Sequence, residues 1–135
     1  MPLNWFSVVT AVVVLALLSG CRTGPIRNVE SARIAMVGGQ APSLEDVERA
    51  IYRGCAVVEP PWHMKKVAPG HIVATINYRS DMAEVDIYFD TRKYSIRYRA
   101  SSNLYYDGKQ IHNNYNAWIQ DLDSAIKAEL AKPSA

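Results

Sequence analysis

The sequence predicts an α+β fold, in which two helices pack on one face of a four-stranded antiparallel sheet. Apolar residues recur at helical spacing near both ends of the predicted domain, over residues 44–54 and 113–131. Between them, residues 62–100 alternate apolar and polar with a period of two, which is typical of half-buried strands. The turns between the strand segments are only two or three residues long, so neighbouring strands must run antiparallel. The predicted order is therefore α-β-β-β-β-α, with the strands in a meander.

The first predicted helix has clear boundary signals. Ser43 is a good N-cap, and Glu45 and Asp46 place negative charge in the first turn, where the helix dipole favours it. Gly54 is typical of the residue that follows a last helical turn, so the helix is expected to end there.

Strand registers can be tested against side-chain chemistry, because opposed residues share a face of the sheet. The strand segments cover residues 62–67, 71–79, 82–90 and 93–100, with turns at 68–70, 80–81 and 91–92. The turn at 91–92 pairs Phe89 with Tyr94, Ile87 with Ile96 and Val85 with Tyr98 on one face, and Asp86 with Arg97 and Glu84 with Arg99 on the other. The turn at 80–81 pairs Ile76 with Val85, Ala74 with Ile87 and Ile72 with Phe89. Both registers select the same apolar inner face.

The last predicted helix carries a wide apolar stripe, which needs a surface to cover. The stripe consists of Tyr115, Trp118, Ile119, Leu122, Ala125, Ile126 and Leu130. Asp123 and Lys127 lie off this stripe. The inner face of the sheet supplies the surface, so both helices are expected on that face.

The N-terminal segment resembles a bacterial lipoprotein signal peptide. An apolar run from Val8 to Leu18 leads into Leu18-Ser19-Gly20-Cys21, which resembles a lipobox. The run is well short of the ~20 apolar residues that a membrane-spanning helix needs. The resemblance implies thioether lipidation of Cys21, removal of residues 1–20 and acylation of the new N-terminus, with palmitate as the expected acyl group. An ordinary signal peptide or an uncleaved anchor is the alternative.

This interpretation divides the chain into three parts. Residues 1–20 form the signal peptide, residues 21–42 a lipid-anchored tether, and residues 43–132 a single globular domain. The apolar stretch Ile34–Val37 leaves room for one short strand in the tether. Arg22 stands where an aspartate would favour retention in the inner membrane of enteric bacteria, so the outer membrane, on its periplasmic side, is the expected location. The membrane is thus the first expected partner, through the lipid on Cys21.

The composition excludes some functions. The 135 residues carry a net charge of only +2, which does not indicate strong nucleic-acid binding. Of the two cysteines, Cys55 lacks an intramolecular partner once Cys21 is lipidated, so the fold cannot depend on a disulfide. Cys55 is expected to be a small buried residue, and a reactive or intermolecular thiol is the alternative.

Two groups of residues are candidates for contacts with an envelope partner. Tyr105 and Tyr106 precede an Asp-Gly turn and can present aromatic area to a sugar or a protein, or else cover the open end of a small core. Arg97 and Arg99 belong to a basic group that can contact acidic envelope polymers or lipid headgroups. Because acidic residues are expected opposite both arginines, cross-strand ion pairs on a solvated face are the alternative.

Polar residues around the start of the last helix allow two interpretations. Asn103, His112 and Asn116 can line a ligand pocket or active site, or His112 can cap the helix while Asn103 ties the preceding loop to it. No serine or cysteine is placed with an identifiable histidine and carboxylate, so no catalytic residue is assigned. His63 and His71 lie roughly 13 Å apart at ~3.3 Å per residue, so no metal site or cofactor is expected.

Five motifs occur together in the mature chain: Tyr94–Tyr98, Ser102–Tyr106, Ile111–Ile119, Val47–Ile51 and Pro69-Gly70. They resemble a family of small, uncharacterised proteobacterial lipoproteins. The resemblance implies a place in the cell envelope and assigns no functional residue. The expected function is a non-catalytic binding or scaffolding module that meets an envelope protein or peptidoglycan. An envelope enzyme or small-ligand binder with a pocket near Asn103, His112 and Asn116 is the alternative.

Overall fold

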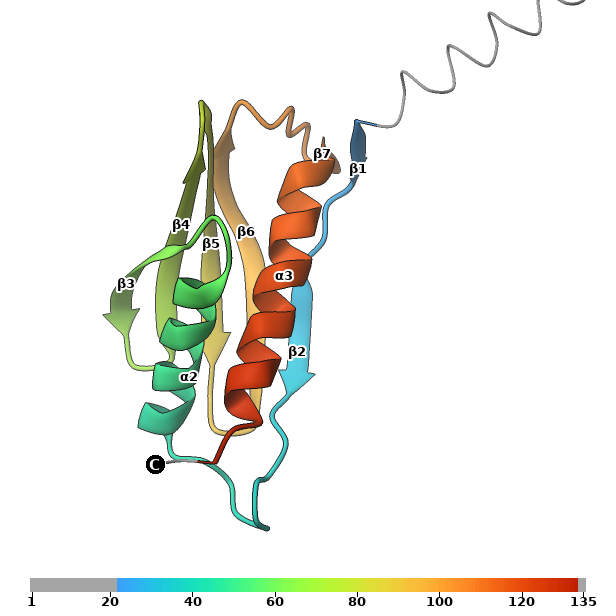
Figure 1. Cartoon of the computed structure of the whole chain (residues 1–135). Helices are drawn as coiled ribbons and strands as arrows, with labels where there is room; N and C mark the ends of the chain where they lie inside the picture. Colours follow the sequence, from blue (N-terminus) through green and yellow to red (C-terminus); the bar gives the residue numbers. More distant parts are fainter. Residues whose placement is uncertain (1–21, 134–135) are drawn as a thin grey trace, which may run out of the picture.

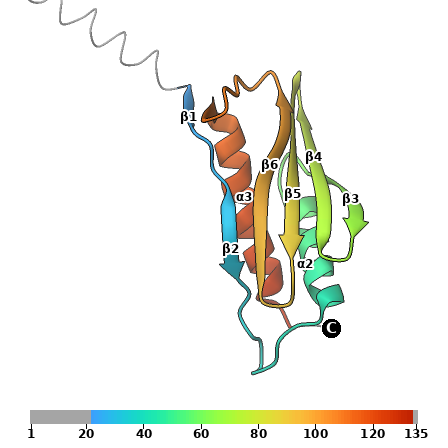
Figure 2. The ribbon, with the colours of Figure 1, turned by 180° about the vertical axis from the view of Figure 1, so that it is seen from behind.

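Five antiparallel strands form the central sheet, and both helices pack on one of its faces (Figure 1, Figure 2). The computed structural model describes residues 22–133. Its elements are β1 (Thr23–Pro25), β2 (Val29–Arg33), α2 (Leu44–Val57), β3 (His63–Ala68), β4 (His71–Tyr78), β5 (Asp81–Phe89), β6 (Lys93–Ser102), β7 (Gln110–His112) and α3 (Asn113–Leu130). The main sheet has the order β2-β6-β5-β4-β3, and β1 pairs with β7 in a separate two-stranded sheet. The predicted α+β class is confirmed, and the predicted four-stranded meander corresponds to β3 through β6, but a fifth strand extends it.

The β5–β6 hairpin has the predicted register on its apolar side. The observed pairs are Phe89 with Tyr94, Ile87 with Ile96, and Val85 with Tyr98. A bulge between Glu84 and Val85 then shifts the register, so Glu84 lies opposite Ala100 rather than opposite Arg99 as predicted. A bulge inserts one extra residue into a strand, which the strict alternation used for the prediction does not anticipate.

The turn between β4 and β5 lies one residue earlier than predicted, which shifts the pairing of the two strands by two residues. Tyr78 pairs with Asp81, so the two-residue turn is Arg79-Ser80, and Ile76 pairs with Ala83 instead of Val85. Arg79 has a φ of 56°, a left-handed conformation that two-residue hairpins use. Each residue's partner is therefore displaced by two positions, and a displacement of two leaves every side chain on its predicted face.

The segment predicted as a tether contains two strands, and neither is the one expected at Ile34–Val37. β1 pairs with β7, and β2 pairs with β6 at the edge of the main sheet. Val29 is buried opposite Ile96, but the register then shifts before Ala32, and Ser31 has a φ of 49°. This irregularity breaks the alternation of apolar and polar residues, so the strand has no periodic signal in the sequence.

Helix α2 begins as predicted and ends later. Ser43 and Asp46 form a reciprocal capping box, in which each side chain accepts a hydrogen bond from the other residue's backbone N–H. The helix continues past Gly54 to Val57, so the prediction that Gly54 ends it is wrong. Gly54 is buried where α2 crosses α3, and a Cβ atom there would lie 2.8 Å from Cγ1 of Ile126. The glycine permits close packing of the helices rather than a helix end.

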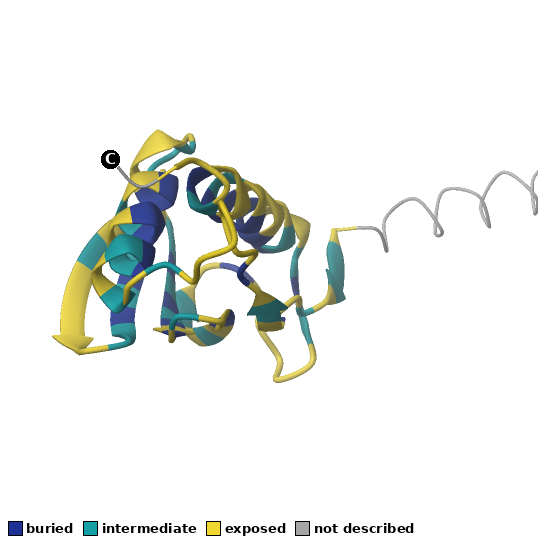
Figure 3. Cartoon of the chain, turned by 90° about the horizontal axis from the view of Figure 1, so that it is seen from below, coloured by how far each residue is buried: buried dark blue, intermediate teal, exposed yellow. Residues whose placement is uncertain are grey.

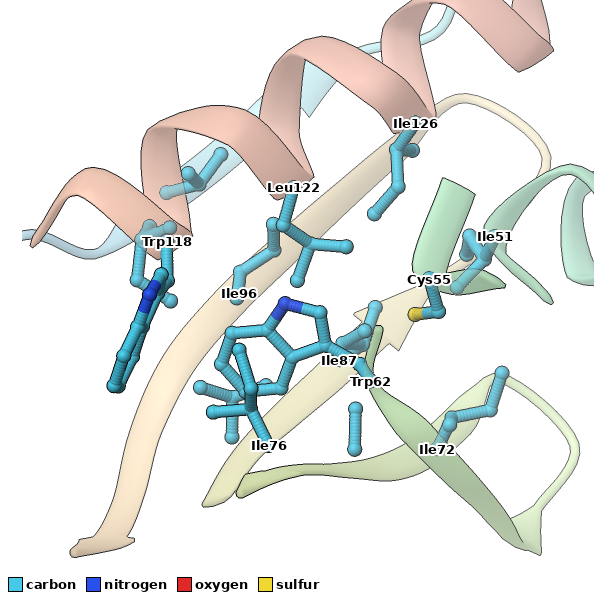
Figure 4. Packing of buried hydrophobic residues seen from close by; sticks show 14 of the residues in the cluster. Ile51, Cys55, Trp62, Ile72, Ile76, Ile87, Ile96, Trp118, Leu122 and Ile126 are labelled. Carbon is cyan, nitrogen blue, oxygen red and sulfur yellow. The ribbon is translucent and has the colours of Figure 1, made fainter. Parts of the chain in front are cut away.

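The core fills the space between the helices and the inner face of the sheet (Figure 3). The indole of Trp62 lies between Leu122 of α3 and Ile76 of the sheet (Figure 4).

Cys55 is fully buried, as predicted, and burial raises the pKa of its thiol to about 12, so the thiol stays protonated near neutral pH. Asp123, which the sequence places off the apolar stripe, is also buried, and the hydroxyl of Tyr94 donates to its carboxylate at 2.5 Å.

Candidate functional site

Two surfaces carry the residues singled out by the sequence. One is the open face, which is the face of the main sheet turned away from α2 and α3 (Figure 3). The other is the end of the molecule where β1, the loop of residues 103–109, β7 and the first turn of α3 lie together (Figure 1). We name it the anchor end, because the lipidation predicted from the sequence falls on the residue before Arg22. Arg97 and Arg99 lie on the open face, and the remaining described candidates lie at the anchor end.

A charged network crosses the open face from β4 to β6. The Asp86 carboxylate lies 2.7 Å from Nε2 of His71, and it accepts a hydrogen bond from Nη1 of Arg99 at 3.1 Å. Arg99 also approaches Glu84, with Nε and Oε2 3.5 Å apart. Asp86 itself is largely shielded from solvent, with a side chain only 14% exposed. The charge of Arg99 is therefore compensated within the sheet, as the sequence predicts.

Tyr88 is the exposed aromatic centre of the open face. Its ring stacks on His71 with a centroid separation of 4.3 Å, and the guanidinium carbon of Arg97 lies 5.7 Å from the ring centroid. The Tyr88 side chain remains 41% exposed. The pairing of Tyr88 with His71 was not predicted, because the register predicted from a turn at 80–81 sets His71 opposite Asp90. The observed register sets His71 opposite Tyr88.

Arg97 has a different ion-pair partner from the one predicted. It lies opposite Asp86 in the register, as expected, but its guanidinium donates to Glu30 of β2 at 3.0 Å. The Glu30 carboxylate raises the pKa of Arg97 above its ordinary value through this hydrogen bond. Glu30 was not predicted as the partner of Arg97, because the strand that carries it, β2, was not predicted.

A shallow hollow of about 340 Å³ opens beside this cluster, at the β5–β6 side of the open face. Its lining includes Tyr88, Arg97, Lys93, Asp90 and the backbone near Gly70. A larger groove of about 580 Å³ lies at the end of the molecule opposite the anchor end, between β2 and the β5–β6 turn, and Arg33 and Arg92 line it. The first hollow adjoins Arg97, one of the two arginines named above as candidates for partner contact.

The loop of residues 103–109 is held in place at several points. The side-chain amide of Asn103 donates to Ser80 and Asp81 in the β4–β5 turn, at 3.0 and 2.7 Å. Leu104 is buried. Asp107 accepts hydrogen bonds from the backbone N–H groups of Gln110, the first residue of β7, and of Lys109 before it, and these bonds lower the pKa of Asp107. Asn103 thus ties the loop to the sheet, whereas the capping interpretation expected it to tie the loop to the last helix.

The two adjacent tyrosines of this loop differ in their surroundings. Tyr106 packs on Tyr98 with a centroid separation of 4.1 Å, and Tyr98 in turn contacts the buried Tyr115. Tyr106 therefore helps to cover the end of the core. Tyr105 is 68% exposed and has a φ of 55°, an uncommon conformation for a large side chain. The fold thus holds the Tyr105 ring out in solvent.

His112 and Asn116 make structural hydrogen bonds at the anchor end. Nδ1 of His112 accepts from the backbone N–H of Asn114 at 3.0 Å, so His112 is the N-cap of α3. Asn116 accepts from the backbone N–H of Arg27 and donates to the carbonyl of Pro25. These contacts fasten the β1–β2 connection to α3. Asn103 bonds to a different segment, so these hydrogen bonds do not join the three residues proposed for a pocket.

Within residues 22–133, no three His, Cys, Asp or Glu side chains gather closely enough to hold a metal ion. No helix in that same part of the chain is both long and apolar enough to cross a membrane. The predicted signal peptide and Cys21 lie outside the described residues.

Comparisons with family models, with curated proteins and with solved structures find no match to this chain.

Proposed function

We propose that this chain is a lipoprotein of the bacterial outer membrane, anchored through Cys21 on the periplasmic side, and that it binds another envelope protein through its open face. The protein acts as a non-catalytic binding or scaffolding module. The lipobox-like sequence at residues 18–21 supports the anchor. The cluster of His71, Tyr88 and Arg97 supports the binding surface.

The observation that carries the binding role is an exposed aromatic and arginine cluster beside a hollow. Both helices cover the other face of the sheet, and no described element covers this one (Figure 3). Tyrosine and arginine are among the residues that contribute most binding energy at protein interfaces. The Tyr88 ring and the Arg97 side chain border a hollow of about 340 Å³, which suits one protruding side chain of a partner.

The charge pattern favours a protein partner over an acidic polymer. Arg97 is paired with Glu30, and Arg99 with Asp86 and Glu84. An acidic polymer is attracted by an excess of positive charge, whereas these arginines are compensated within the sheet. A protein surface can contribute the apolar and aromatic contacts that the Tyr88 cluster offers.

The anchor is tested by mass spectrometry of the membrane fraction. Chain expressed in a Gram-negative host should yield an N-terminal peptide that begins at Cys21 and carries lipid. The Cys21→Ser variant is the control, and it should lack the modification. A mature chain that begins elsewhere, or one that retains Met1, would contradict the anchor.

The binding surface is tested by crosslinking and pull-down in cells. We expect a specific partner to be captured by the wild type and lost with Tyr88→Ala/Arg97→Ala. The Tyr105→Ala/Tyr106→Ala variant is the control from the anchor end, and it should retain the partner. If only the loop variant loses the partner, the open face is not the binding surface. Binding of purified protein to isolated peptidoglycan, unchanged in both variants, would also contradict a protein partner on the open face.

The competing function is an envelope enzyme that uses His112. Its test is a His112→Ala variant that folds correctly. If no partner is captured and this variant reproduces the phenotype of a deletion, the binding proposal is wrong and the His112 region carries an activity.

A further inference from the structure

We infer that the anchor end of the domain rests directly on the membrane, with the Tyr105 ring and the side chains of Arg22, Arg79 and Lys109 among the lipid headgroups. This inference depends on the proposed lipidation of Cys21. It assigns the loop of residues 103–109 to the membrane and leaves the open face to the protein partner.

The first support is that the chain is fastened to the fold immediately after the lipidation position. The carbonyl of Arg22 accepts a hydrogen bond from the backbone N–H of Asn113 at 2.9 Å, and Thr23 pairs with His112 in the β1–β7 ladder. Ile26 donates to the carbonyl of Lys109 at 2.9 Å. Consecutive Cα atoms lie about 3.8 Å apart, so a lipid on Cys21 begins at this end of the domain with no free tether between them.

The second support is the position of the exposed tyrosine. The loop between β6 and β7 lies at the same end of the molecule as β1, and the β4–β5 turn is also at that end (Figure 1). Asn103 joins the loop to this turn through Ser80 and Asp81. The Tyr105 ring is therefore held on the surface from which the lipid emerges, and it does not depend on a mobile segment to reach the bilayer.

The third support is the chemistry of the exposed side chains at this end. Tyrosine has an apolar ring and a polar hydroxyl, which suits the boundary between headgroups and acyl chains. Arg22, Arg79 and Lys109 are exposed there, and basic side chains near an anionic membrane surface are attracted to it. The acidic groups nearby are engaged in hydrogen bonds, Asp81 with Asn103 and Asp107 with the backbone at the start of β7.

This placement orients the rest of the molecule. The strands of the main sheet run lengthwise from the anchor end to the opposite end (Figure 1, Figure 2). With the anchor end on the bilayer, the strands stand away from the membrane and the open face is turned sideways. A partner in the periplasm or in the same membrane can then reach Tyr88 and Arg97 without competing with lipid.

The inference is tested with spin labels on the full-length lipoprotein in vesicles of phosphatidylethanolamine and phosphatidylglycerol. Three single-substitution variants, Tyr105→Cys, Met36→Cys and Tyr88→Cys, are labelled with a nitroxide. Met36 is the matched control, because it is 65% exposed against 68% for Tyr105 and lies in the β2–α2 connection at the opposite end (Figure 1). The wild type controls for labelling of Cys55, which is buried and should not react.

We expect the label at position 105 to collide several-fold less often with a water-soluble nickel complex, and more often with oxygen, than the label at position 36. The label at position 88 should behave like the label at position 36. Equal nickel accessibility at positions 105 and 36, in protein whose Cys21 lipid has been verified by mass spectrometry, would overturn the membrane contact and leave the anchor standing. An unmodified Cys21 would overturn the anchor and this inference together.

Discussion

The two faces of the main sheet are built from the same strands and have opposite roles. On the covered face, Ile72, Ile87 and Ile96 are fully buried beneath the helices. On the open face, the neighbouring positions hold His71, Tyr88 and Arg97, which contact one another and solvent. Burial of apolar surface stabilises the fold, whereas exposed charges contribute little to it. The covered face therefore determines whether the chain folds, and the open face is free to be selected for binding.

The largest effect on stability is expected for Trp62→Ala, at the centre of the covered face. Trp62 is 2% exposed and packs between the helices and the sheet (Figure 4). Truncation of a buried tryptophan leaves a cavity and lowers the free energy of unfolding by about 3–5 kcal/mol. Chemical denaturation of the mature domain measures this loss.

The matched change on the open face is Tyr88→Ala. Because Tyr88 is half exposed, its truncation should lower the free energy of unfolding by much less. The loss should stay within about 1 kcal/mol, which includes the lost stacking on His71. Equal losses for Trp62→Ala and Tyr88→Ala would show that the two faces contribute alike to stability, and that the covered face does not dominate folding.

A loss between those of Trp62→Ala and Tyr88→Ala is expected for Tyr94→Phe, which removes a buried hydrogen bond on the covered face. The Tyr94 hydroxyl donates to the carboxylate of Asp123 at 2.5 Å, and both residues are buried. Loss of a hydrogen bond to a charged group lowers the free energy of unfolding by about 1.5–3 kcal/mol. Lys127 pairs with the other carboxylate oxygen of Asp123 at 3.1 Å, and this contact is left in place by the variant.

The same hydrogen bond has a characteristic pH dependence. Desolvation, and then the bond to Asp123, raise the pKa of Tyr94 above its ordinary value of 10.0. A raised pKa contributes stability that is fully present below pH 10 and is lost as the pH rises above it. The difference in unfolding free energy between wild type and Tyr94→Phe should therefore be constant from neutral pH to about pH 9 and shrink at higher pH. A difference that stays constant through pH 11 would mean that Tyr94 is not shielded as described.

Alternation in the sequence predicted the covered face well because errors of two residues do not move side chains between faces. The prediction set Ile76 opposite Val85, and the structure sets it opposite Ala83, yet all three residues are buried. The long helix α3 was also predictable, since its apolar stripe extends over many turns and His112 provides its cap. Periodicity is thus sufficient to identify a core, even where the register is wrong.

The side-chain contacts of the open face and the anchor end could not be predicted, because they depend on pairings that the periodicity of the sequence does not indicate. Glu30 meets Arg97 only because β2 adds to the sheet beside β6, although the two residues are far apart in the sequence. Asp123 is polar by type and was placed off the stripe, because nothing in the local sequence indicates that the hydroxyl of Tyr94 donates to its carboxylate. The contacts of Asn103 and Asn116 with distant turns are of the same kind. Long-range polar contacts require the fold before they can be assigned.

Gly54→Ala tests how closely the two helices of the covered face approach each other. At an exposed helical position this change stabilises a helix by about 1 kcal/mol, since glycine has poor helix propensity. At Gly54 the new Cβ would lie 2.8 Å from Cγ1 and 3.0 Å from Cα of Ile126, so α2 and α3 must separate. We expect a loss of about 1–3 kcal/mol in the free energy of unfolding, typical of an overpacked core. A stabilised variant would show that the helices are not packed as described.

The smallest effect on stability is expected for Arg97→Ala on the open face. The side chains of Arg97 and Glu30 are 52% and 55% exposed, and exposed ion pairs are typically worth about 0.2–1 kcal/mol. A double-mutant cycle with Glu30→Ala should give a coupling energy in this range, and it should shrink in 1 M salt, where the screening length is only about 3 Å.

Arg49→Ala is the matched variant on the helical side, because it removes a surface ion pair with Asp46 on α2. Both variants should unfold at nearly the wild-type denaturant concentration, because both pairs are solvent-exposed. Only Arg97→Ala should weaken capture of the partner, since Arg97 borders the hollow beside Tyr88. A coupling energy above about 2 kcal/mol for Arg97 and Glu30 would exceed the range of exposed pairs and make the open face part of the folding core. Unchanged capture by Arg97→Ala would remove Arg97 from the binding surface and leave Tyr88 as the residue to test.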